Sequence, residues 1–250
     1  SVAVDQWNFD NVSHAQTPTY TSALDFDGST SEITLDSNST LSNDTAVSFW
    51  MKASSQSGYG QICYGLGSDM AYQYLSTNGS GSDLYVYDGT FYKIVDDAYD
   101  GNWNHIVVSY NNTTNEVKGY KNGVLDQTVS ATWSNQSFIG FLGARNGIRQ
   151  LNGLLSNFGI FTGTLDQTAV TSLYNNGNPL VDMSSFTSLD GFWKLDNLTT
   201  GIQDSKGSNN GTNNAATVTD VQVSTLNGLS DGMTTANLVN SDLTRSIPYS

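Results

Sequence analysis

The residue types in this sequence best suited to chemistry are aromatic, and that chemistry is ligand binding. Tyrosines are concentrated in the middle third of the chain, several in i, i+2 pairs that place both rings on one face of a strand. A tyrosine ring can stack on the apolar face of a sugar while Asn, Asp and Ser side chains hydrogen-bond its hydroxyls. A further aromatic residue lies in the loop 131–135, where no periodic pattern requires it. The candidate ligand-binding residues are Tyr72, Tyr74, Tyr85, Tyr87 and Trp133. The alternative is ordinary cross-strand packing for the tyrosines and an edge-capping role for the tryptophan.

Catalytic residue types are scarce by comparison. Asp25 and Asp27 form the one pair of carboxylates at i, i+2 in a strand-like run, but they precede the turn at Gly28 and look structural. Of the two histidines, His105 alternates with apolar strand residues, which predicts a core position, and the other lies in a polar loop. The lone Cys63 is flanked by apolar and aromatic residues and predicts a buried thiol. We therefore expect no catalytic residues and a protein that is not an enzyme.

Composition excludes several classes of partner. The 23 acidic residues outnumber the 9 basic ones, which gives a formal charge of −14. The basic residues are scattered singly, whereas nucleic-acid binding needs clustered Lys and Arg. An anionic membrane surface is disfavoured for the same reason, and no apolar run approaches the ~20 residues that cross a bilayer. We expect no nucleic acid as partner and no membrane insertion.

The elements that position these residues are mostly strands. Period-2 alternation bounded by turn residues predicts strands at 84–87, 91–95, 103–110, 116–121, 124–129, 137–142 and 154–161, besides three earlier runs. Asp88-Gly89 and Asn122-Gly123 predict two tight hairpins. One helix is predicted over 165–174, capped by Asp166 and ended by residues 175–177. The pattern predicts an all-β, antiparallel sandwich with one short helix.

The composition of the sequence changes after Pro179, where Gly, Asn, Ser and Thr become the commonest residues. The peptide at 7–11, Trp-Asn-Phe-Asp-Asn, is echoed at 193–197 by Trp-Lys-Leu-Asp-Asn. We therefore expect a complete β-sandwich module at 1–180, followed at 181–250 by an extended segment that resembles the opening of a following repeat plus a linker. Chance similarity among Asn- and Ser-rich peptides is the alternative.

Several motifs occur in an order typical of one family: Leu-Asp-Phe-Asp-Gly at 24–28, Phe-Trp-Met-Lys at 49–52, Asn-Trp-Asn-His-Ile-Val-Val-Ser-Tyr at 102–110, and Gly-Leu-Leu-Ser-Asn-Phe-Gly-Ile-Phe at 153–161. The chain thereby resembles the laminin G-like, concanavalin A-like jelly-roll domains of bacterial and phage surface proteins, over roughly residues 5–178. The resemblance implies an extracellular, cell-surface or virion-surface module that binds carbohydrate or mediates adhesion. Its implied partners are a glycan or surface polysaccharide and neighbouring copies or domains of the same assembly.

Two other functions remain open at this point. The first is a structural decoration, fibre or spacer module of a phage particle or surface assembly, whose C-terminal segment docks on a neighbouring domain. The second is a glycan-active enzyme with a divergent site, because enzymes also use the jelly-roll fold.

The resemblance implies one ion, and no cofactor is required. Some relatives bind a structural Ca²⁺ through carboxylates near the penultimate strand and the domain opening, where this sequence has Ser156 and Asn157 in place of an acidic pair. Asp10, Asp25 and Asp27 remain as Ca²⁺ ligands. The alternative is that they are solvated carboxylates at strand ends and turns.

Overall fold

The computed structural model describes residues 22–40, 44–64, 74–131 and 138–220. Its strands are β1 (Ser22–Asp27), β2 (Glu32–Thr40), β3 (Thr45–Ser54), β4 (Gln61–Tyr64), β5 (Tyr74–Ser76), β6 (Leu84–Tyr87), β7 (Phe91–Val95), β8 (Asp100–Asn111), β9 (Glu116–Lys121), β10 (Val124–Ser130), β11 (Phe138–Leu142), β12 (Asn152–Thr162), β13 (Leu189–Trp193), β14 (Gly211–Asn214) and β15 (Thr217–Asp220). The helix α1 (Gln167–Tyr174) is followed by a 3₁₀ turn at Asn175–Gly177.

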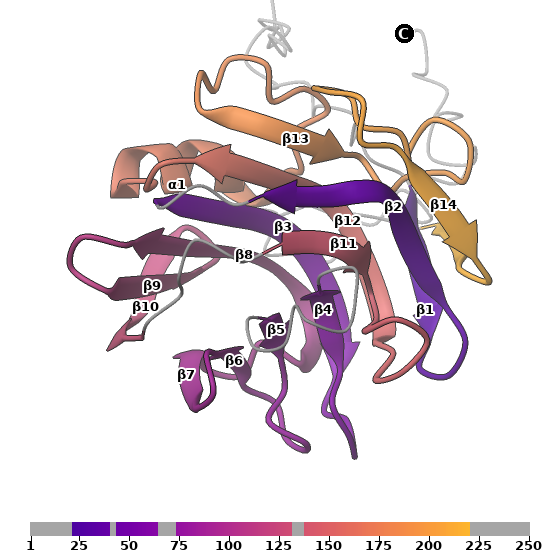
Figure 1. Ribbon diagram of the computed structural model, residues 1–250, viewed down its shortest axis with the longest axis horizontal. Helices are drawn as coiled ribbons and strands as arrows, with labels where there is room; N and C mark the ends of the chain where they lie inside the picture. The colour runs from indigo at the N-terminus through magenta and orange to yellow at the C-terminus, as the bar shows by residue number, and fades with distance from the viewer. Residues whose placement is uncertain (1–21, 41–43, 65–73, 132–137, 221–250) are drawn as a thin grey trace, which may run out of the picture.

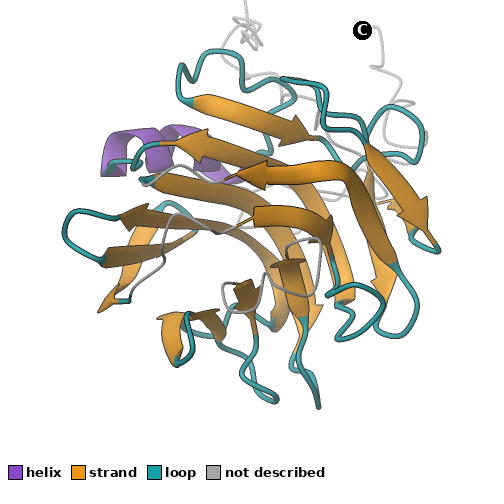
Figure 2. Ribbon diagram, viewed as in Figure 1, coloured by secondary structure: helices purple, strands orange, loops and turns teal. Residues whose placement is uncertain are grey.

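These strands form two antiparallel sheets packed face to face (Figures 1 and 2). Sheet A has the order β10-β9-β8-β3-β12-β1-β15, with β13 also paired to β12, and sheet B has the order β14-β2-β11-β4-β5-β6-β7. The predicted all-β jelly-roll sandwich with one short helix is confirmed. Apolar side chains of both sheets fill the space between them, where Phe49 of β3 stacks on Phe158 of β12 with ring centroids 5.7 Å apart.

Local sequence signals account for the two predicted hairpins. In β6, Leu84 and Val86 are fully buried in the core, whereas Tyr85 and Tyr87 alternate with them and lie partly exposed. The hairpin between β9 and β10 turns at Asn122 and Gly123, with φ angles of 52° and 82°. Asn and Gly tolerate this left-handed backbone better than other residues, so this dipeptide sets the turn.

The helix α1 also forms where its sequence predicts it. The Asp166 carboxylate accepts a hydrogen bond of 2.8 Å from the backbone N–H of Ala169, and Asn175 ends the helix in a left-handed conformation. Val170 and Leu173 are buried in a cluster with residues of sheet A. The helix thus covers part of the outer face of that sheet (Figure 2).

Residues beyond 180 belong to the same sandwich, which corrects the expected division of the chain. β13 pairs with β12, β14 with β2, and β15 with β1. The physical reason is burial: Trp193 and Leu195 are fully enclosed in the main core. The part of the expected 181–250 segment that the structure describes therefore docks on its own sandwich. The first copy of the proposed repeat and residues 221–250 lie outside the described residues, so the repeat stays a prediction.

Candidate functional site

Four aromatic side chains gather at the outer face of sheet B, and we call them the aromatic patch: Tyr59, Tyr85, Tyr87 and Phe91. Phe91 is the centre of this patch. Its ring centroid lies 5.9 Å from that of Tyr59, 5.9 Å from that of Tyr85 and 4.7 Å from that of Tyr87. All four side chains are partly exposed. The patch is therefore a contiguous aromatic surface that solvent reaches.

The β6–β7 hairpin and one loop build the patch. Tyr87 and Phe91 are register partners across the hairpin, and both pack on Phe141 of β11, which is 3% exposed. Tyr59 comes from the loop between β3 and β4. The next residue fixes that loop: the carbonyl of Gly60 accepts a hydrogen bond of 2.7 Å from the buried hydroxyl of Tyr99. Because this anchor lies in the core, Tyr59 is held in place beside Phe91.

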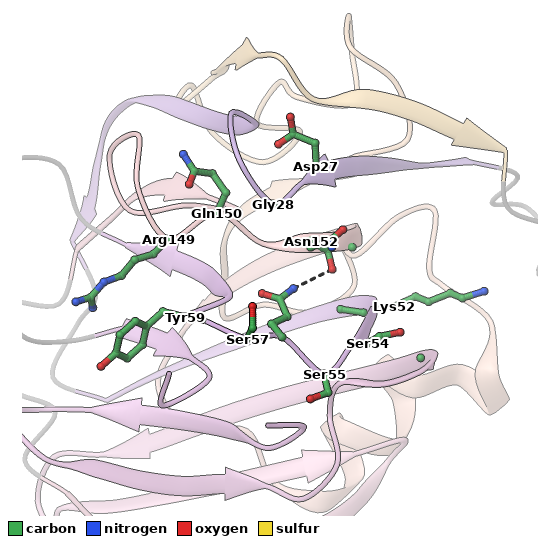
Figure 3. A pocket seen from close by; sticks show the side chains of 15 residues that line it. Asp27, Gly28, Lys52, Ser54, Ser55, Ser57, Tyr59, Arg149, Gln150 and Asn152 are labelled. Carbon is green, nitrogen blue, oxygen red and sulfur yellow. Dashed lines mark hydrogen bonds between the residues drawn. The ribbon is translucent and has the colours of Figure 1, made fainter. Parts of the chain in front are cut away.

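A polar pocket of about 720 Å³ adjoins the patch at Tyr59 (Figure 3). It is formed by the turn after β1, the end of β3 with the loop that follows, and the start of β12. Its lining includes several hydroxyl and amide side chains, among them Ser54, Ser57, Gln150 and Asn152. Gln56 braces the pocket wall, because its Nε2 donates a hydrogen bond of 2.9 Å to the backbone oxygen of Asn152 (Figure 3).

Arg149 joins the pocket to the patch. It lines the pocket, and its guanidinium carbon lies 4.0 Å from the centroid of the Tyr59 ring. Its backbone is left-handed, with φ 59°, a conformation that costs free energy for a residue with a long side chain. The carbonyl of Arg149 accepts a hydrogen bond from the backbone N–H of Gln61, at the start of β4. Backbone and ring contacts together hold the guanidinium at the rim of the pocket.

The predicted carboxylate ligands have structural partners. The Asp27 carboxylate accepts hydrogen bonds from Ser29, Thr30 and Ser31 in the turn after β1. These bonds, of which the one from the Thr30 hydroxyl contributes most, hold the pKa of Asp27 far below its usual range. The Asp25 carboxylate accepts a hydrogen bond of 3.0 Å from the hydroxyl of Thr219.

This geometry does not suit a Ca²⁺ site. Asp10 lies outside the described residues. Within the described part of the chain, no three His, Cys, Asp or Glu side chains come together as metal ligands. Ca²⁺ needs six to eight oxygen ligands, and the Asp27 oxygens are engaged in the turn. Asp25 and Asp27 by themselves therefore supply too few ligands for Ca²⁺, and a Ca²⁺ site that also includes Asp10 stays a prediction.

The structure brings together two of the five predicted ligand-binding residues. Tyr85 and Tyr87 both belong to the aromatic patch. Tyr74 lies opposite Tyr87 in the register of β5 and β6, and only its backbone is described. Tyr72 and Trp133 lie outside the described residues. Sequence reasoning missed Phe91, whose place after the Asp88-Gly89 turn could have signalled it, and Arg149, for which the sequence holds no local signal.

Comparison with known protein families identifies the family of this chain. Residues 27–171 match the laminin G-type family described as the concanavalin A-like lectin/glucanases superfamily. The chain belongs to this superfamily. No curated protein sequence matches the chain. None of the described helices is long and apolar enough to cross a membrane.

Two solved structures share the concanavalin A-like fold. One is a candidate carbohydrate binding protein from Bacteroides ovatus, with 16% identity and a TM-score of 0.62. The match covers 81% of this chain and 60% of that protein, so the chain spans less than two thirds of its length. The other is a heptameric SAP-like pentraxin from Limulus polyphemus, with 13% identity and a TM-score of 0.53, where 83% of this chain matches 98% of the pentraxin. At these identities both relatives support the fold alone.

The superfamily includes glucanases, but the groups of this sandwich that could act as nucleophile or base are buried. Ser48 Oγ and His105 Nε2 lie 2.8 Å apart, yet these residues are 0% and 1% exposed. The Tyr174 ring lies against the His105 ring, with centroids 6.0 Å apart. Burial lowers the pKa of His105 to about 3, and burial likewise raises the pKa of the Cys63 thiol to about 12. All three groups are packed into the protein, where no substrate can reach them.

Proposed function

We propose that this domain binds carbohydrate without cleaving it, as a module of an extracellular or surface protein. One observation carries the proposal: a solvent-accessible aromatic patch is continuous, through Tyr59 and Arg149, with a pocket lined by hydroxyl and amide groups. Aromatic rings pack against the apolar faces of sugar rings, and hydroxyl and amide groups pair with sugar hydroxyls. The two halves of the site therefore supply both kinds of contact that a glycan needs.

Membership of a superfamily of lectins and glucanases supports the same ligand class. The Bacteroides ovatus relative, a candidate carbohydrate binding protein, is consistent with it. The extracellular or surface location that we propose follows from this ligand class, since polysaccharides of surfaces and matrices are met outside the cell.

The pocket chemistry favours binding over hydrolysis. Glycosidases of the retaining type need two carboxyl groups about 5–5.5 Å apart, and inverting ones need two at a larger separation. Among the described residues that line the pocket, Asp27 is the one carboxylate. Its strongly lowered pKa suits a fixed structural anion and not a proton donor.

A direct binding measurement tests the proposal. The protein is screened on a glycan array, and hits are titrated by calorimetry with the wild type, Tyr59→Ala and Phe91→Ala. Loss of a stacking ring should weaken binding about 5- to 50-fold. Leu125→Ala is the matched control, because Leu125 is 44% exposed on β10 of the other sheet and its removal should leave affinity unchanged.

Two results would refute the proposal. An array without hits at high protein concentration would refute the proposal that the domain binds carbohydrate. Release of reducing ends from a polysaccharide, at a rate proportional to the concentration of this protein, would show that the domain cleaves its ligand.

A further inference from the structure

We infer that the polar pocket holds an internal stretch of a polysaccharide, about three consecutive sugar residues long, with the polymer continuing past the pocket at both ends. This inference rests on the proposed function and specifies its ligand class, which is an extended polymer and not a single sugar or a chain end. It is carried by the way in which the pocket crosses one sheet.

The pocket crosses a row of four neighbouring strands of sheet A, in the order β1-β12-β3-β8. Residues that line it are paired across these strands: Asp27 of β1 with Asn152 of β12, and Gly153 of β12 with Ala53 of β3. On β8 the lining residue is Gly101. Neighbouring strands lie about 4.8 Å apart, so the row is about 14 Å wide.

The strands that flank this row stop short of the pocket. β15 pairs with β1 over residues 22–25, before the lining residue Asp27. β9 pairs with β8 over residues 106–111, beyond the lining residue Gly101. Neither flanking strand therefore closes an end of the row, which is the shape that a continuous polymer chain requires.

The width of the row and the spread of its polar groups set the length of the bound stretch. One sugar residue advances a glycan chain by roughly one strand spacing, about 5 Å, so the row spans about three residues. Hydrogen-bonding side chains are distributed along it: Asn152 on β12, Ser54 at the end of β3 and Ser57 in the loop that follows (Figure 3). Each added sugar should therefore tighten binding about 3- to 10-fold, the effect of about one net hydrogen bond, until the row is filled.

The loop after β3, which borders the row, is fixed by the contacts of Gln56. Its side-chain Nε2 donates a hydrogen bond of 2.9 Å to the backbone oxygen of Asn152. Its backbone oxygen accepts one of 3.3 Å from the N–H of Gly81. The row thus keeps its width through contacts within the protein, which reduces the ordering that a bound chain must impose.

Calorimetric titration of oligosaccharide ladders tests this inference. The probes are β-1,3-linked glucose, β-1,4-linked glucose and β-1,4-linked mannose, each from one to six residues. Each hexamer is also used after borohydride reduction, which opens its terminal ring. Soluble polymers of the same linkages, in two mean lengths, report how many protein molecules bind one chain.

Two serine variants locate the bound stretch. Ser54 is exposed next to Gly101 at the β8 end of the row, so Ser54→Trp should fill that end. Ser130→Trp is the matched control, because Ser130 is an exposed serine of β10 that does not line the pocket. Thermal melting of each variant controls for folding, and the wild-type titrations stand without them.

We expect at least one ladder to bind with an affinity that rises from the monosaccharide through the trimer. Reduction of the hexamer should change its affinity less than 2-fold, and the number of protein molecules per polymer should rise in proportion to polymer length. Ser54→Trp should weaken hexamer binding about 10-fold, and Ser130→Trp should change it less than 2-fold.

A monosaccharide that binds as tightly as its hexamer would overturn this inference and leave the proposed function standing. One protein molecule per polymer chain, whatever its length, would show binding at chain ends and would overturn it in the same way. Failure of all three ladders to bind would also overturn it. The proposed function would fall as well only if the glycan array gave no hit.

Discussion

Tyr87 and Phe91 face each other across the β6–β7 hairpin, with ring centroids 4.7 Å apart and ring planes at 52°. Both side chains are partly exposed, so this contact is made on the surface of sheet B and not in the core between the sheets. Each ring limits the rotamers of the other. The patch is thereby ordered by its own contacts, which would lower the entropic cost of the binding proposed above.

The Tyr87–Phe91 contact should be measurable as a coupling energy. In a double-mutant cycle of Tyr87→Ala and Phe91→Ala, we expect the unfolding free energies to be non-additive by about 0.5–1.5 kcal/mol, the usual size for an aromatic pair. Urea denaturation measures this quantity. A cycle of Tyr87→Ala with Leu125→Ala, on different sheets, should be additive, and equal coupling in both cycles would contradict the contact.

His105 should make stability depend on pH. Its folded pKa, about 3, lies below the ordinary 6.5 because burial disfavours the charged ring. Below pH 6.5 the unfolded chain therefore binds a proton at His105, whereas the folded protein binds it only at about pH 3. The contribution of neutral His105 to the unfolding free energy is thus fully present above pH 6.5 and is lost progressively as the pH falls toward 3. The decline should be about 1.4 kcal/mol per pH unit.

The window from pH 7 to pH 5 isolates this effect, because carboxylates titrate mainly below it. Denaturant unfolding at several pH values in that window should show the slope in the wild type. His105→Gln keeps a hydrogen-bonding group near Ser48 and removes the titration, so its slope should be close to zero. An unchanged slope in His105→Gln would assign the effect to another group.

Trp193 should be essential for the stability of the whole sandwich. Its side chain is fully buried, and its Nε1 donates a hydrogen bond of 2.9 Å to the backbone oxygen of Asn209. Trp193→Ala should cost about 3–5 kcal/mol of unfolding free energy. Val218→Ala, in an exposed position of β15, should change it by less than about 0.5 kcal/mol. A single loss of structure, monitored by circular dichroism, would confirm that residues 189–220 unfold with the rest.

Cys63 should be unreactive in the folded protein. The residue is 3% exposed, and burial raises the pKa of its thiol to about 12. At pH 8 the native protein should therefore react with a thiol reagent many times more slowly than the protein in denaturant, because both access and thiolate are lacking. Rapid stoichiometric labelling of the native protein would show that the core around β4 opens readily.

The sequence predicted those parts of the fold that local signals specify. The Asn122-Gly123 turn, the alternation in β6 and the Asp166 cap of α1 each depend on residues within a few positions of one another. β14 and β15 depend instead on partners more than 170 residues earlier, such as Thr34 opposite Thr212. Short strands rich in Asn and Thr show no alternation, so nothing in residues 211–220 distinguished them from a linker.

The site was predictable in the same partial way. Period 2 placed Tyr85 and Tyr87 on one face, and the fold then made that face the outer one. The contact between Arg149 and Tyr59 joins residues 90 positions apart and arises only when β4 and the start of β12 come to the same end of the sandwich. The spacing of neighbouring residues in the sequence therefore cannot predict such a contact.

The pairing of β15 with β1 at the edge of sheet A determines which residues lie at the end of β1 opposite the pocket. Ser22 and Asp220, the first and last described residues, are register partners at one end of β1, whereas Asp27 at the other end of β1 lines the pocket. At about 3.3 Å per residue, the six residues of β1 separate the two ends by roughly 17 Å. A support linked to the protein at Ser22 or Asp220 would therefore lie at the opposite end of β1 from the pocket, and it should not obstruct a polysaccharide approaching from solution.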